Sequence, residues 1–217
     1  MKRAAEKLFD FPVVYRAKFF FTGLIFRLVK PVMFRTHFTL EEVLLQNIPG
    51  GTSVLEIGCG DGANFRLLAA REGGVGRFCG VDVNPHMVEY CRSRHPEARW
   101  LVAARPPYTD AGERFDRVVI INVLHHLDDR PAIVGILREA ARLGTEIVLF
   151  EPLQSENPLL HALKRFYWLV TDGGNLYLRH HEFKSLFAEA GLVVKWEAMS
   201  APLRHFYAAR LTGSRRV

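Results

Sequence analysis

The sequence has 217 residues, of which 49% are hydrophobic and 24% carry a charge. A chain of this length and composition can bury one α/β core, and it has no low-complexity tract. The net charge of +6 is moderate and does not by itself require nucleic acid as a partner. The three cysteines, Cys59, Cys79 and Cys91, fit neither a metal site nor a disulfide framework. We therefore expect no bound metal and a reducing compartment, which is the cytoplasm.

The first 45 residues are expected to form a helical arm in front of the main domain, residues 46–217. The longest uninterrupted apolar run of the arm, residues 19–26, is too short for a spanning helix, which needs about 20 residues, and no signal-peptide cleavage site follows. Two interpretations remain open: the arm is an amphipathic lid over a ligand cleft, or it rests on the periphery of a membrane. Its basic side chains would lie at the rim in either case: Arg16, Lys18, Arg27 and Lys30.

A helix over residues 39–46 leads into the pattern on which the rest of the prediction depends. Residues 54–57 form a short apolar strand that contains Glu56, and glycines follow at positions 58, 60 and 62. A helical pattern opens directly after them. Glycines let the backbone turn sharply and approach a ligand closely, and a strand, glycine turn and helix begin a doubly wound nucleotide-binding sheet. The carboxylate of Glu56 would repel a pyrophosphate, whereas it suits a ligand with a cationic methionyl group.

A second strand is expected over residues 77–83 and ends in Asp82, which lies 24 residues after Gly58. At this spacing a carboxylate can accept hydrogen bonds from both hydroxyl groups of a ribose. The alternative is that Asp82 caps the helix that Asn84 and Pro85 begin.

The following elements alternate between strand and helix, as a parallel sheet requires. Strands are expected over residues 99–103, 115–122 and 146–152, with a helix over residues 131–142. The run at 115–122 is almost continuously apolar, which is typical of a buried parallel strand.

Polar side chains follow two of these strands at the point where each strand ends. Asn122, His125 and His126 come after the fourth strand, and Glu151 comes at the end of the fifth. A histidine pair is usually structural, but the carboxyl end of a central strand is where open α/β sheets bind ligands. This place favours a cleft position for one of the two histidines.

The remaining chain contains a long connection and three further elements. Residues 153–180 are rich in aromatic side chains and are either a substrate-side insertion or a surface helix that caps the sheet. A helix opening at residue 181 is expected to stop at Gly191, and two strands follow, over residues 192–199 and 204–211.

The acid, the glycine turn, Asp82 and the histidine pair resemble the motifs of the class I S-adenosylmethionine-dependent methyltransferases of the small-molecule type (methyltransferase 11/12-like). The resemblance continues at matching spacing over about a hundred residues. It implies a Rossmann-like, doubly wound, mostly parallel seven-stranded sheet with an antiparallel last strand, and S-adenosyl-L-methionine as cofactor. The resemblance also implies the residues that bind the cofactor: Glu56, Gly58, Cys59, Gly60, Asp82, Val83, Met87, Ala103, Ala104 and Asn122. Met87 would contact the adenine, and the alternative is that its side chain belongs to the core. The sequence departs from the family after the third strand, where Ala103 and Ala104 replace the usual Gly-Asp, so no carboxylate is available for the adenine amino group.

The sulfonium carbon of the cofactor is already a strong electrophile, so the protein mainly has to hold the nucleophile in line. A base is needed only where the nucleophile is a hydroxyl or an ammonium group, and the candidates are His126, His125, Glu151 and Tyr15. The apolar arm and the aromatic insertion favour O- or N-methyl transfer to a lipid, a quinone or a secondary metabolite.

Three alternatives stay open beside a small-molecule methyltransferase. An NAD-binding oxidoreductase would need a hydride-transfer site such as a Tyr-x-x-x-Lys pair, and the chain has none. A non-catalytic S-adenosylmethionine-binding protein would explain the missing acid after the third strand. An RNA methyltransferase fits the positive charge, but the base-flipping motif Asn/Asp-Pro-Pro-aromatic is absent, so no nucleic acid is expected.

Overall fold

The structure, a computed structural model, describes residues 39–108, 111–112, 114–155, 157–159, 161–162, 174, 176–200 and 206–214. Residues 1–38 of the predicted N-terminal arm, with Tyr15, and half of the predicted insertion lie outside these residues. None of the helices in the described part of the chain has the length and apolarity that a membrane crossing requires.

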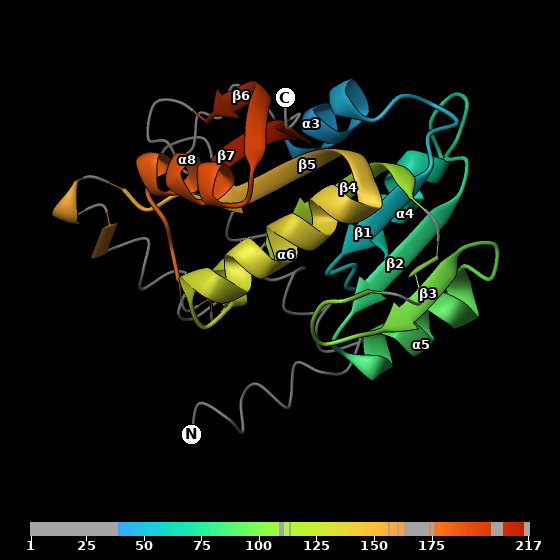
Figure 1. Ribbon diagram of the computed structural model, residues 1–217. Coiled ribbons are helices and arrows are strands. Elements are labelled where there is room, and N and C mark those ends of the chain that lie inside the picture. The colour runs from blue at the N-terminus through green and yellow to red at the C-terminus, as the bar shows by residue number, and fades with distance from the viewer. Residues whose placement is uncertain are drawn as a thin grey trace.

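The described chain forms a seven-stranded sheet with the strand order β3-β2-β1-β4-β5-β7-β6 (Figure 1). Its strands are β1 Val54–Ile57, β2 Phe78–Asp82, β3 Arg99–Val102, β4 Phe115–Ile121, β5 Gly144–Pro152, β6 Leu192–Met199 and β7 Phe206–Gly213. The first five strands pair in parallel, whereas β7 runs antiparallel to both β5 and β6. The predicted Rossmann-like sheet with an antiparallel last strand is therefore confirmed.

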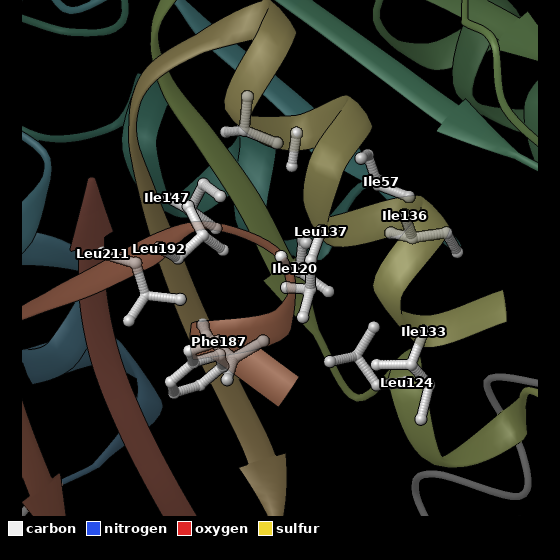
Figure 2. Packing of buried hydrophobic residues seen from close by; sticks show 14 of the residues in the cluster. Ile57, Ile120, Leu124, Ile133, Ile136, Leu137, Ile147, Phe187, Leu192 and Leu211 are labelled. Carbon is white, nitrogen blue, oxygen red and sulfur yellow. The ribbon is translucent and has the colours of Figure 1, made fainter. Parts of the chain in front are cut away.

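Helices cover both faces of this sheet (Figure 1). One face carries α3 Leu40–Asn47, α4 Ala63–Ala69 and α5 Pro85–Arg94, and the other carries α6 Arg130–Leu143 and α8 His180–Glu189. Figure 2 shows the core between α6, α8 and the sheet, where Ile57 of β1 and Ile120 of β4 meet Leu137 of α6. Parallel strands buried by helices on both faces explain the long apolar runs in the sequence.

The helix boundaries follow local capping chemistry. The Asn84 side chain accepts a hydrogen bond from the backbone of His86 and caps α5, and Asp129 caps α6 through the backbone of Ala132. Helix α4 ends at Ala69, and the turn that follows it contains Gly73 and Gly74, which take positive φ values of 77° and 56°.

The strand order changes direction between β1 and β4. Successive connections from β1 lead outward to β2 and β3, whereas β4 and β5 lie on the other side of β1. In open α/β sheets this switch point leaves a crevice outside the carboxyl ends of the strands, where ligands bind. The candidate site is therefore expected where β1, β2, β4 and β5 end.

The close approach of β2 to β3 gives the first testable prediction. A Cβ on Gly80 would lie 2.5 Å from the ring of Trp100, so Gly80→Ala should lower the free energy of unfolding by about 1–3 kcal/mol through overpacking. Gly135→Ala on α6 is the matched control, because its new methyl group meets nothing within 4 Å and alanine favours a helix. Urea unfolding of both variants checks this, and equal midpoints for Gly80→Ala and the wild type would refute the packing argument.

Candidate functional site

The glycine turn lies between β1 and α4 at the switch point. Gly58, Gly60 and Gly62 all have positive φ values, of 78°, 49° and 75°. The N–H groups of Gly58 and Cys59 both donate to the carbonyl of Val81 in β2, at 2.7 and 3.1 Å. A Cβ on Gly58 would lie 2.3 Å from a methyl group of Val123, so the turn packs directly against the loop that follows β4.

Glu56 is a buried acid beneath this turn, with a side chain that is only 1% exposed. Its Oε1 accepts a hydrogen bond from the Asn64 side chain at 2.5 Å, while Oε2 has no hydrogen-bond partner among the described residues. Burial, with a smaller effect of the carboxylates of Asp82 and Asp61, raises the pKa of Glu56 to about 8, although the hydrogen bond from Asn64 lowers it. A buried carboxyl group with one unsatisfied oxygen fits a ligand that brings a cationic hydrogen-bond donor.

Asp82 ends β2 and joins the glycine turn to the start of α5. Its Oδ2 accepts a hydrogen bond from the Gly60 backbone at 2.8 Å, and its Oδ1 accepts one from Asn84 at 2.9 Å. Burial raises the pKa of Asp82, whereas these hydrogen bonds and the nearby His126 lower it. The side chain that caps α5 is that of Asn84, not that of Asp82. The hydrogen bonds from Gly60 and Asn84 hold the Asp82 carboxyl group at the end of β2, where the crevice is expected.

The other residues predicted to contact the cofactor differ in exposure. Val83 is 64% exposed and Ala104 is also exposed, whereas the side chain of Met87 is buried at 2%. Cys59 is buried too, and the backbone of Ala103 donates to the Asp82 carbonyl at 3.0 Å. The structure thus brings the glycine turn, Asp82 and the start of the segment after β3 together, and the contacts of these residues with a cofactor stay predictions.

The loop after β4 brings the remaining candidates to the same end of the sheet. Asn122 has a φ of 55°, a left-handed conformation that asparagine tolerates better than most residues, and its N–H donates to Phe150 of β5 at 2.9 Å. The short helix η2, Leu124–His126, follows.

Glu151 organises this loop from the end of β5. Its side chain is fully buried, and its Oε1 accepts hydrogen bonds from the backbones of Val123 and Leu124 at 2.6 and 2.8 Å. Its Oε2 lies 2.8 Å from Nδ1 of His125, whose side chain is 2% exposed. A carboxylate oxygen accepts a hydrogen bond, so the ring hydrogen of neutral His125 lies on Nδ1. The other ring nitrogen, Nε2, then carries the lone pair that accepts a proton.

The structure separates the two neighbouring histidines. His125 is buried and paired with Glu151, whereas His126 is exposed and close enough to Asp82 to lower the pKa of that carboxyl group. The two rings still lie 4.1 Å apart between centroids. A histidine oriented by a carboxylate has the arrangement of a general base.

Two side chains at this site were not predicted from the sequence. Asn64, in the first turn of α4, holds Glu56, and a polar residue directly after a glycine turn was a usable signal. Tyr177 stacks on His125 with 5.4 Å between ring centroids, and no spacing in the sequence connects these residues. Within the described residues, no three His, Cys, Asp or Glu side chains are grouped so that they could hold a metal ion.

Comparison with known proteins assigns the family. Residues 33–195 match a family model described as a methyltransferase domain. The chain belongs to this methyltransferase family. The cofactor of class I members is S-adenosylmethionine, and the buried Glu56 and the glycine turn fit it.

Similar proteins include two curated methyltransferases and many solved structures. The chain is 28% identical over 145 residues to a 2-phytyl-1,4-naphtoquinone methyltransferase of Thermosynechococcus vestitus (64% of this chain, 63% of that protein). It is 35% identical over 98 residues to a ubiquinone biosynthesis O-methyltransferase of Methylobacterium sp. (43% of this chain, 38% of that protein). The chain thus matches less than two thirds of the length of either relative. An O-methyltransferase from neocarzinostatin biosynthesis, crystallised with S-adenosyl-L-homocysteine and 1,4-dihydroxy-2-naphthoic acid, shares the fold (TM-score 0.62, 19% identity, 96% of this chain, 60% of that chain).

The raised pKa of Glu56 predicts a pH-dependent stability in the absence of cofactor. Because its pKa of about 8 exceeds the ordinary 4.5, the folded protein keeps a proton that the unfolded chain loses above pH 4.5. This contribution is complete below pH 4.5 and is lost as the pH rises through about 8. The free energy of unfolding should fall over this range, by at most about 1.4 kcal/mol per pH unit, and Glu56→Gln should fall less steeply. Urea unfolding at several pH values checks this, and equal slopes for both proteins would contradict it.

Asp82 gives a prediction for the cofactor. Asp82→Ala removes a carboxylate that would accept hydrogen bonds from the ribose, so calorimetry should show affinity for S-adenosyl-L-homocysteine weakened by about 1.5–3 kcal/mol. Asp116→Ala is the control, because Asp116 is bound to Ser53 at the opposite end of the sheet. Unchanged affinity in Asp82→Ala would remove Asp82 from the site.

Proposed function

We propose that this protein is an S-adenosylmethionine-dependent methyltransferase that transfers a methyl group to oxygen or nitrogen of an apolar small molecule. The observation that carries the proposal is a pair of acids, the buried Glu56 and the half-buried Asp82, on either side of a glycine turn at the switch point of the sheet. A pyrophosphate-binding oxidoreductase would place phosphate charge near these acids, which makes it the weaker candidate.

In this proposal Glu56, Asp82, Val83 and the glycine turn bind the cofactor, each in its own way. The unsatisfied Oε2 of Glu56 would accept a hydrogen bond from the methionyl ammonium group, and the cation would favour the ionised carboxylate. Asp82 would bind the ribose hydroxyl groups, and the exposed Val83 would contact the adenine. The turn at Gly58 and Gly60 would let the backbone approach the ligand without interference from a Cβ.

His125 is the base that the geometry supports best. Bound S-adenosylmethionine supplies an electrophilic methyl group, and its sulfur keeps the electron pair of the broken bond. As the acceptor oxygen forms its new bond to carbon, Nε2 of His125 would take the hydroxyl proton. The carboxylate of Glu151 would then stabilise the resulting imidazolium through Nδ1. Glu151 is a positioning residue here, since both of its oxygens are already engaged. The exposed His126 remains the second candidate.

The acceptor class rests on the relatives and on the apolar character of the chain. The names of both curated relatives refer to quinones, and one of them specifies O-methyl transfer, which supports a hydroxyl group on a quinol ring as the acceptor. Residues 11–35 would form the lid of the acceptor chamber and residues 153–179 its substrate-side wall. An acceptor of this kind resides in membranes, so the arm would also contact the membrane periphery of a cytoplasmic enzyme.

Methyl transfer itself is the test. Purified protein with S-adenosylmethionine labelled in its methyl group should label reduced 2-phytyl-1,4-naphthoquinone or a demethylated ubiquinol. His125→Gln should lower turnover about 10²–10⁴-fold while calorimetry shows S-adenosyl-L-homocysteine still bound.

His126→Gln is the matched histidine variant. If turnover falls in this variant and stays unchanged in His125→Gln, His126 is the base. If neither variant loses turnover, the enzyme uses no histidine base. A wild-type protein that binds the cofactor but labels no quinol would refute the acceptor class, and one that binds no cofactor would refute the function.

A further inference from the structure

The chain returns toward α8 across the face of the Glu151–His125 pair. We name residues 176–178 the strap. The backbone N–H of Leu176 donates to the carbonyl of His125 at 2.9 Å. Leu178 pairs with Leu153, and its carbonyl accepts a hydrogen bond from Gln154 at 2.8 Å. The strap is therefore fixed both to the histidine loop and to the chain just beyond Glu151.

Two residues of this region contact the His125 ring. The ring of Tyr177 is stacked on it, with 5.4 Å between centroids and 21° between planes. A Cβ on Gly174 would lie 2.4 Å from Cδ2 of His125 and 2.5 Å from the hydroxyl oxygen of Tyr177. Cδ2 is bonded to Nε2, so the backbone of Gly174 lies along the ring edge that carries the nitrogen not used by Glu151.

We propose that Gly174 and Tyr177 are positioning residues that fix the plane of the His125 ring, an inference that rests on the proposed function. The hydrogen bond to Glu151 sets which nitrogen carries the hydrogen, whereas contacts on the face and the edge of the ring decide whether the ring can tilt about that bond. The stacked ring of Tyr177 and the close backbone of Gly174 prevent that tilt. A base has to stay within hydrogen-bond reach of the acceptor proton, and a displacement of about 1 Å can cost a hundredfold in rate.

The glycine at position 174 has no backbone reason to be a glycine. Its φ lies outside the left-handed range, so alanine would fit the main chain. The nearest atoms that a new methyl group would meet all belong to the side chains of His125 and Tyr177. Gly174→Ala therefore disturbs the two rings and leaves the backbone path intact.

Histidine-selective NMR on the full-length protein tests the proposal without an acceptor. The ring signals of His125 are assigned by their loss in His125→Gln. Gly174→Ala and Tyr177→Ala should move these signals and change the pH at which His125 titrates. Gly135→Ala, the open glycine on α6, should leave them in place.

Turnover of the quinol substrate supplies the second readout. Gly174→Ala and Tyr177→Ala should each lower kcat about 10–100-fold and shift its pH profile, with little change in KM for S-adenosylmethionine. Tyr177→Phe, which keeps the stacked ring, should restore most of the turnover that Tyr177→Ala loses. In a His125→Gln background, Gly174→Ala should cause no further loss, because the group that it displaces is already gone.

Three results would overturn the proposal. His125 signals that stay unchanged in both variants would show that the rings do not fix each other. An equal loss of turnover from Gly174→Ala in the wild-type and His125→Gln backgrounds would assign another role to Gly174. If Gly174→Ala does not fold, the comparison of Tyr177→Ala with Tyr177→Phe decides, and equal turnover in the two would contradict the stacking role. Failure of the proposed function would appear separately, as a wild-type protein that neither binds S-adenosyl-L-homocysteine nor transfers methyl groups.

Discussion

The carboxylate of Glu151 holds the loop after β4 in place at the switch point of the sheet. It is fully buried and binds two backbone N–H groups and the His125 ring, which come from the loop after β4. The pairing of Ile121 with Phe150 places the ends of β4 and β5 in register, so the side chain from one strand reaches the loop of the other. Hydrogen bonds to a charged group contribute about 1.5–3 kcal/mol each, so Glu151 stabilises this conformation of the loop.

The position of this loop also affects the glycine turn between β1 and α4. Val123, held by Glu151, fills the space next to Gly58 that a side chain there would need. The glycine turn in turn donates to Asp82 through Gly60. Burial disfavours the charged form and raises the pKa of both Glu56 and Asp82, although the hydrogen bond from Asn64 opposes this rise for Glu56, and backbone hydrogen bonds and His126 oppose it for Asp82. A ligand that brings positive charge and hydroxyl donors would relieve this cost, which is the physical reason why these acids suit S-adenosylmethionine.

The fold and the conformation of the glycine turn were predictable because their signals are local. The glycine turn, Asp82 and the caps of α5 and α6 are specified by residues within a few positions of one another, and apolar runs mark the parallel strands. The difference between His125 and His126 was not predictable, since it depends on a carboxylate 26 residues away and on the rotation of a short helix. The contact of Tyr177 with His125 depends on how a long connection returns to the sheet, and no periodicity encodes that.

The central claim is that the switch point of this sheet binds S-adenosylmethionine and not a dinucleotide. A thermal-shift measurement with S-adenosyl-L-homocysteine and NAD on the same protein preparation tests it most directly. Ligand that binds only the folded protein stabilises it by about 2.7 kcal/mol at a hundredfold excess over Kd, which for a chain of this size raises Tm by about 5–10 °C. The account predicts this rise with S-adenosyl-L-homocysteine and none with NAD. A rise with NAD alone, or no rise with either ligand, would contradict it.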